Sequence, residues 1–112
     1  MSLDVLEISA QNFQLTDSIK NHVVEKMNKV ISHDKAIVKL DVVLKEENHK
    51  DNIGNMQAKA NLAFHKHHIH HEVKGEDMYH SINELSEHLI REIRKEHRKF
   101  NSDRRDGLNP EK

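Results

Sequence analysis

The amino-acid sequence predicts an α+β fold: a two-layer sandwich in which two helices cover one face of a four-stranded sheet, in the chain order β-α-β-β-β-α. Two segments repeat apolar residues at helical spacing, and three others alternate apolar and polar residues as half-buried strands do. Each of these segments has a single apolar face, which can be buried only if both helices pack on the same side of the sheet. The chain has 112 residues, of which 35% are hydrophobic and 33% charged, so we expect one domain with a lean, mostly aliphatic core.

The first strand and the first helix are expected within the first 32 residues. The run 3–10 is rich in residues that favour strands and predicts a short one. Thr16 then provides an N-cap, with Asp17 in the first helical turn. Apolar residues follow at steps of four, four and three until the helix ends near Ser32; they are Ile19, Val23, Met27 and Val30.

Three further strands are predicted from alternation, over 36–46, 56–64 and 67–73. A loop is expected over 47–55 and a turn near His65 and Lys66, although this pair lacks the Asn-Gly or Asp-Gly sequence of tight hairpins. The positions expected to face the core are, strand by strand, Val38, Leu40, Val42 and Leu44; Met56, Ala58, Ala60, Leu62 and Phe64; and His67, Ile69, His71 and Val73.

A long second helix is expected to begin at about Asp77 and to close the domain. Its apolar stripe steps by four, three, four and four through Met78, Ile82, Leu85, Leu89 and Ile93. No periodicity remains after Phe100. The sequence therefore predicts a folded domain over 1–100 and a flexible C-terminal tail over 101–112.

The charges are distributed unevenly along the chain. The formal net charge is -1, but residues 1–87 carry a net charge of -4 and residues 88–112 a net charge of +3. Such a contrast is typical of a local anion-binding surface on an otherwise acidic protein.

Basic residues of the second helix lie opposite its apolar stripe and next to one another. Several form like-charge pairs four residues apart, each of which destabilises an isolated helix by about 0.2–0.5 kcal/mol. Binding to a polyanion such as a phosphate backbone would explain why these cations lie together. The alternative is a solvated helix end, supported by the Glu87–Arg91 spacing and by the helix dipole, and the charge pattern alone leaves both open. The candidate RNA-binding residues of this helix are Arg91, Arg94, Lys95, Arg98 and Lys99.

The first helix adds a narrower polar strip beside its apolar face. It contains His22, Lys26 and Lys29, which taken alone are more typical of a soluble helix surface. If the two helices share one layer, their basic strips form a groove that can hold folded RNA by its backbone. With only 4% aromatic residues, stacking of single-stranded bases is a weaker prediction.

A histidine-rich run occupies the expected fourth strand. His68 and His70 share one face and His67 and His71 the other, so a metal pair is sterically possible. No H-E-x-x-H sequence accompanies them, and half-exposed strand histidines, with His67 and His71 partly buried, are the favoured interpretation. We therefore expect no metal site, and keep a metal-binding protein as an alternative hypothesis.

Other function classes have little support in the sequence. There is no cysteine, Gly-rich phosphate loop, G-x-S-x-G sequence or convincing pair of acids, so neither an enzyme nor a cofactor or small-molecule substrate is expected. No apolar stretch is long enough for a membrane span, and no basic segment precedes an apolar one at the N-terminus, so we expect a cytoplasmic protein without a membrane partner.

The segment 75–85 resembles the signature of the ribosome hibernation-promoting factor and ribosome-associated inhibitor A family. The resemblance rests on Glu76-Asp77-Met78-Tyr79 leading into the helix that carries Leu89, Arg91, Ile93 and Lys95. The segments 8–29 and 38–45 also resemble the family, so the similarity extends over about 3–100. It implies the same β-α-β-β-β-α fold, which is related to double-stranded-RNA-binding domains.

The resemblance implies a stress or stationary-phase factor that binds the small ribosomal subunit and its rRNA in the channel for messenger and transfer RNA. Such a factor inhibits translation by keeping idle ribosomes inactive. Lys26, Lys29, Arg91 and Lys95 match basic positions on the family's rRNA-facing helices. A protein–protein adaptor that uses the open face of the sheet is the second alternative.

The sequence departs from the family pattern in three places. His88, which with His22 is among the candidate RNA-binding residues, stands where relatives commonly carry Lys, which makes its RNA contact pH-dependent or absent. The histidine-rich strand replaces a more apolar one, and its turn lacks the usual Asn-Gly. The end of the sequence at Lys112 suggests a short form without the additional C-terminal domain, and leaves open whether ribosomes are paired or kept single.

Overall fold

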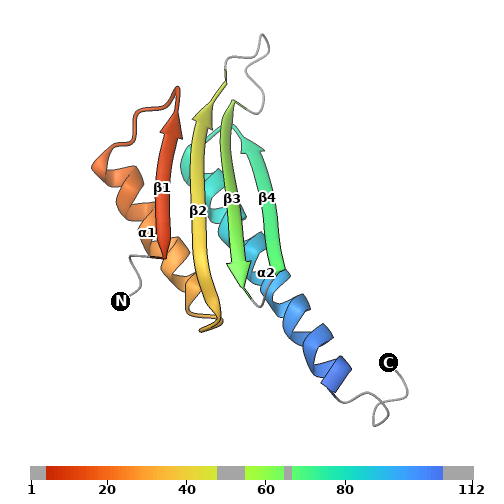
Figure 1. Ribbon diagram of the computed structural model, residues 1–112. Coiled ribbons are helices and arrows are strands. Elements are labelled where there is room, and N and C mark those ends of the chain that lie inside the picture. Colours follow the sequence, from red (N-terminus) through yellow and green to blue (C-terminus); the bar gives the residue numbers. More distant parts are fainter. Residues whose placement is uncertain (1–4, 48–54, 65–66, 105–112) are drawn as a thin grey trace.

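The computed structural model describes residues 5–47, 55–64 and 67–104, and within the last range it describes side chains up to Arg98. The elements follow one another in the predicted order β-α-β-β-β-α, which confirms the fold class (Figure 1). Their bounds are β1 Leu6–Gln11, α1 Asp17–Ile31, β2 Ile37–Glu46, β3 Met56–Phe64, β4 His67–Gly75 and α2 Met78–Arg104.

The four strands form one sheet in the order β1-β2-β3-β4. β1 runs parallel to β2, as the intervening α1 allows, and the two other pairs are antiparallel. The pairing aligns Leu6, Leu40, Leu62 and Ile69 in one row across all four strands. The register is therefore the one that places the apolar residues of every strand on the same face.

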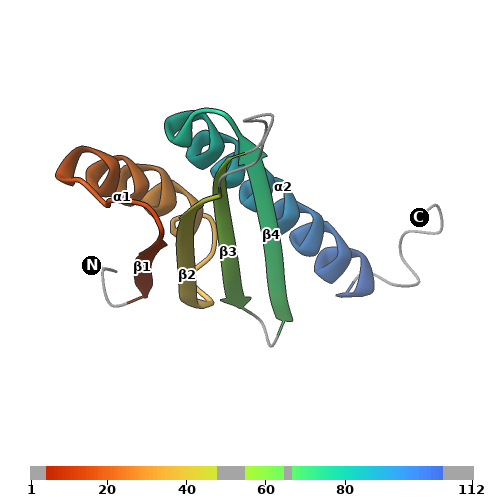
Figure 2. The same cartoon turned by 90° about the horizontal axis from the view of Figure 1, so that it is seen from above.

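Both helices cover that apolar face and leave the other face of the sheet open (Figure 2). The side chains of the predicted helical stripes are buried, including Val23, Met27, Leu85 and Leu89, none of which is exposed to solvent. Gly75 ends β4 just before α2, where an added Cβ would lie 2.8 Å from Ser81 Oγ. Its lack of a side chain allows the first turn of α2 to pack closely against the sheet.

The N-cap predicted for α1 is confirmed. Thr16 Oγ1 accepts a hydrogen bond of 3.3 Å from the Ile19 backbone N–H. The hydroxyl thereby satisfies one of the N–H groups that a helix leaves unpaired at its start.

One core position in β2 was predicted wrongly. Val38 is 68% exposed, whereas Ile37 is 5% exposed and takes its place in the core. The pairing of β2 with β3 shifts register between Ile37 and Lys39. This irregularity reverses the alternation at the start of the strand, and from Leu40 onward the buried positions are those predicted.

Two other expectations change at element ends. His67 is exposed, not partly buried, because it is the first residue of an edge strand. α2 continues to Arg104, four residues beyond the predicted boundary of the domain at residue 100, since no Gly or Pro interrupts the sequence before Gly107. The remaining tail residues 105–112, most of the 47–55 loop and the turn at 65–66 lie outside the described residues.

Candidate nucleic-acid interface

The predicted basic residues of α2 lie on its solvent-exposed side, opposite the buried stripe. Arg91, Arg94, Lys95 and Arg98 are all exposed, whereas Leu89 and Ile93 of the same helix are fully buried. Lys95 Nζ forms an ion pair of 3.4 Å with Glu92 Oε2. Because this pair is exposed, it contributes little to stability and leaves the ammonium group available to a phosphate.

The basic strip of α1 faces the flank of α2. His22 Nε2 forms a hydrogen bond of 2.8 Å with Asn83 Oδ1, and its ring contacts the Tyr79 ring edge-on at 4.9 Å between centroids. Lys26 and Lys29 follow His22 by one and two turns on the same side of α1. They therefore lie along the boundary between the two helices, with Lys29 exposed and Lys26 half-buried.

A second contact between distant residues fixes the direction of the helices. His97 Nε2 lies 2.7 Å from Asp34 Oδ2 in the connection after α1, and Asp34 Oδ1 accepts the Ala36 backbone N–H at 2.8 Å. Because residues 22 and 34 meet residues 83 and 97, the two helices run side by side in the same direction. This brings the α1 lysines next to the half of α2 that contains the arginines.

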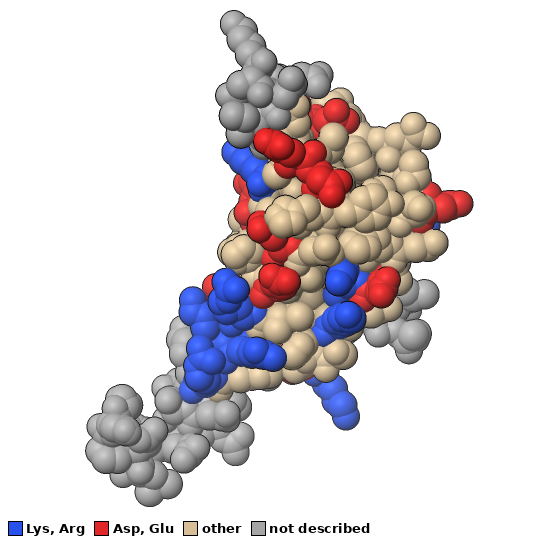
Figure 3. Space-filling model, turned by 180° about the vertical axis from the view of Figure 1, so that it is seen from behind, with Lys and Arg blue, Asp and Glu red and all other residues tan. Residues whose placement is uncertain are grey.

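We call the set Lys26, Lys29, Arg91, Arg94, Lys95 and Arg98 the basic face. Figure 3 shows Lys and Arg gathered on the half of the helix layer nearest the C-terminal end of α2, and most Asp and Glu on the other half. The acidic half includes Glu76, Asp77 and Glu84. Among the side chains that the structure describes, those at the C-terminal end of the helix layer are the ones suited to a polyanion.

The two histidines predicted to bind RNA occupy other surroundings. His22 bridges the helices, as described above. His88 is turned to the flank of α2 that faces β4, where its ring stacks on that of His71 with centroids 4.5 Å apart and planes at 26°. The structure thus places both beside the basic face, with their rings engaged in contacts within the protein. The side chain of Lys99 lies outside the described residues.

The pKa of His71 is lowered, first by burial and then by the neighbouring His88, with smaller contributions from His70 and Arg91; Glu92 opposes the shift. His71 ends the row that begins with Ile8, Val42 and Ala60, so its imidazole faces the core side of the sheet. Burial disfavours the charged form of the ring. His71 is accordingly neutral at neutral pH.

This shift predicts that the fold loses stability as pH falls from about 6.5, because the unfolded chain then binds a proton at residue 71 that the folded state resists. Replacing His71 with Leu removes the titrating group from an otherwise apolar row. We expect His71→Leu to show a smaller fall in melting temperature between pH 7.5 and 5.5 than the wild type. The matched variant His68→Leu, at an exposed position of the same strand, should keep the wild-type fall. Equal falls in all three proteins would contradict the assignment.

The described part of the histidine run, residues 67–71, does not converge on a candidate metal centre. Among the described residues, no three His, Asp or Glu side chains come close enough together to hold a metal ion. His70 Nδ1 forms a hydrogen bond of 2.7 Å with Asn61 Oδ1, and His67 Nε2 lies 3.9 Å from Glu96 Oε1. These contacts tie β4 to the adjacent strand and to α2.

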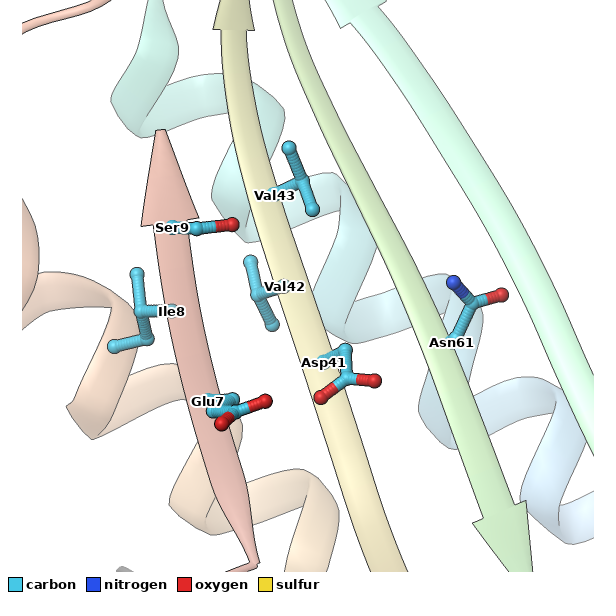
Figure 4. Close-up of a pocket in the computed structure, with 7 residues that line it drawn as sticks. All are labelled: Glu7, Ile8, Ser9, Asp41, Val42, Val43 and Asn61. Carbon is cyan, nitrogen blue, oxygen red and sulfur yellow. The ribbon is translucent and has the colours of Figure 1, made fainter. Parts of the chain in front are cut away.

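The open face of the sheet has a different character from the basic face. A shallow pocket there is lined by residues of β1, β2 and β3, among them Glu7, Asp41 and Asn61 (Figure 4). Lys39 Nζ forms ion pairs of 3.2 Å with Glu7 and 3.8 Å with Asp41. The charges around this pocket are of both signs and form ion pairs with one another, so the open face of the sheet is a poor surface for phosphate.

A family match covers most of this chain. The sequence matches the family described as sigma 54 modulation protein / S30EA ribosomal protein over residues 6–101. The chain belongs to this family. The match confirms the resemblance to ribosome hibernation factors noted from the sequence.

This chain has the same fold as proteins of known structure. It superposes on a ribosomal subunit interface protein from Coxiella burnetii with a TM-score of 0.72 and 14% identity, covering 82% of this chain and 96% of that one. It also superposes on the N-terminal domain of Protein Y from Thermus thermophilus with a TM-score of 0.60 and 19% identity, covering 76% and 93%. No curated protein sequence matches this chain. None of the helices in the described part of the chain is long and apolar enough to cross a membrane.

Sequence reasoning missed the residues that hold the two helices together. The Asp34–His97 and His22–Asn83 contacts join positions more than sixty residues apart, and no local pattern predicts them. It also missed a pocket on α2 lined by Glu87, Ile90, Arg91 and Arg94. The available signal in the sequence was Glu87, a carboxylate that precedes Arg91 by one helical turn and Arg94 by two.

Proposed function

We propose that this protein binds the small ribosomal subunit through its basic face, in the channel used by messenger and transfer RNA, and keeps idle ribosomes inactive. The observation that carries the proposal is the alignment of two basic strips, more than sixty residues apart in the chain, on one exposed end of the helix layer. Membership of a family that includes ribosomal proteins supports the same partner. Binding to ribosomes would also place the protein in the cytoplasm.

The chemistry of the basic face suits a folded RNA backbone. Arginine guanidinium groups can bind phosphate oxygens in pairs, and lysine ammonium groups add point charges. Both helices rest on a sheet with a buried core, so the two basic strips keep their relative position before RNA arrives. Contacts of this kind select shape and charge more than base sequence.

The inhibition follows from occupancy and requires no catalytic step. Messenger and transfer RNA are polyanions that need the same channel of the subunit. A protein that neutralises the phosphates lining this channel and fills its volume excludes both. Release would then depend on competition or on weakening of the electrostatic contacts.

Salt sensitivity of small-subunit binding tests this proposal. If about four to six cations contact phosphates, the logarithm of the association constant should fall with a slope of about -3 to -5 against the logarithm of salt concentration. Affinity should then drop about a hundredfold to a thousandfold between 50 and 200 mM salt, measured by co-sedimentation with purified small subunits. A partner held by the open face of the sheet would give binding that survives nuclease treatment and high salt, and this result would favour the adaptor hypothesis.

A further inference from the structure

A small pocket lies on α2 within the basic face. It has a volume of about 250 Å³ and is lined by Glu87, Ile90, Arg91 and Arg94. Ile90 is half-buried and packs against the core, whereas the three charged residues are exposed. Drug-sized ligands occupy pockets of about 300–1,000 Å³, so this one has room for a smaller group, of the size of a single nucleobase.

The pocket lies on the flank of α2 that meets α1. Glu87, Ile90 and Arg94 continue the strip that begins at Asn83 and ends at His97, the two residues of α2 that contact α1 and the segment after it. The pocket is therefore held between two cross-helix contacts. A group that enters it lies next to the other cations of the basic face, which gather at this end of the helix layer (Figure 3).

Glu87 is unexpected in a surface that binds only phosphate. Within the described residues its carboxylate forms no ion pair, although Arg91 follows it by one helical turn. A carboxylate beside bound RNA repels phosphate and lowers affinity. Glu87 would weaken a purely phosphate-directed surface, but it is well placed to accept hydrogen bonds from a ligand that carries N–H groups.

We propose that the pocket takes one unpaired guanine base of the rRNA, an inference that rests on the proposed function and adds base recognition to it. Ile90 provides an apolar floor, and the guanidinium plane of Arg91 or Arg94 can stack on the base. The two oxygens of Glu87 accept the adjacent N1–H and N2–H groups of guanine, giving a paired, charge-assisted contact.

The other bases fit this arrangement less well. Adenine presents an acceptor at N1, and cytosine presents an acceptor at N3 beside its single amino group. Uracil has one N–H between two carbonyl oxygens, which a carboxylate repels. Guanine alone offers two neighbouring donors on its Watson–Crick edge, so the site selects it by hydrogen bonding and not by size.

The test compares the wild type with Glu87→Gln and Glu72→Gln on purified small subunits. Both substitutions remove one negative charge, and Glu72 lies exposed on the open face of the sheet, away from the basic face. Kethoxal, which modifies N1 and N2 of unpaired guanine, reports which guanines the protein shields. We expect the wild type and Glu72→Gln to protect at least one guanine that Glu87→Gln leaves reactive. Glu87→Gln should also bind about tenfold more weakly, as expected for a lost hydrogen bond to a charged group.

The outcomes separate the two proposals. If Glu87→Gln binds as tightly as the wild type or more tightly and shields the same guanines, Glu87 only faces phosphate and the base site is refuted. Ribosome binding through the basic face would survive that result. If the wild type fails to co-sediment with small subunits at low salt, the proposed function is refuted, and the guanine site with it.

Discussion

Replacing Lys29 and Arg91 together with Glu should reduce small-subunit binding by about a hundredfold or more. One residue comes from each helix, so the double variant places negative charge on both sides of the basic face. Each lost charge-assisted contact costs about 1.5–3 kcal/mol, and every 1.4 kcal/mol is a factor of ten in affinity. The slope of binding against salt should also become shallower by about 2, because two phosphate contacts are gone. Co-sedimentation over a salt series measures both quantities.

The matched control replaces Lys59 and Lys74 with Glu. This variant has the same change of net charge, but both lysines lie on the open face of the sheet. Its binding should stay close to that of the wild type, and circular dichroism and thermal unfolding verify that both double variants fold. Equal losses of binding in the two variants would show that only net charge matters. The basic face would then lose its special role.

Replacing Ile37 with Ala should lower the free energy of unfolding by about 2–5 kcal/mol. Ile37 is 5% exposed at the start of β2, and truncating it leaves a cavity that the surrounding core cannot fully close. Urea unfolding followed by circular dichroism measures the difference from the wild type.

Val38→Ala is the matched comparison, because it truncates the adjacent β-branched residue. Val38 is 68% exposed, so its loss should cost less than about 1 kcal/mol. Strict alternation along the strand predicts the opposite order, with the larger loss at Val38. A larger loss at Val38 than at Ile37 would therefore contradict the register shift observed between β2 and β3.

The uneven charge of the helix layer also restricts how the protein can sit on RNA. Glu76, Asp77 and Glu84 lie toward the start of α2, and the basic face lies toward its C-terminal end. Phosphate attracts one half of the layer and repels the other. We therefore expect the C-terminal half of α2 to lie closest to the rRNA, with the start of the helix pointing away from it.

Local patterns determined the elements of this fold. The apolar steps in 19–30 and 78–93 and the alternation in 56–64 depend only on helical and strand geometry, so α1, α2 and β3 were predicted with their buried faces. The Thr16 cap is equally local. The prediction failed at Val38, where pairing with another strand changed the register, because alternation describes a regular strand and contains no information about its partner.

The candidate site was likewise predictable only in part from the sequence. The sequence by itself determined which side of each helix carries cations, since helical periodicity fixes Lys26 and Lys29 on one and Arg91, Arg94 and Arg98 on the other. Only the tertiary structure decided that these strips lie side by side, that His22 and His88 contact other side chains, and that Glu87 borders a pocket. The physical reason is that the relative position of two helices depends on the sheet beneath them and on contacts between distant residues, and neither leaves a periodic signal in the chain.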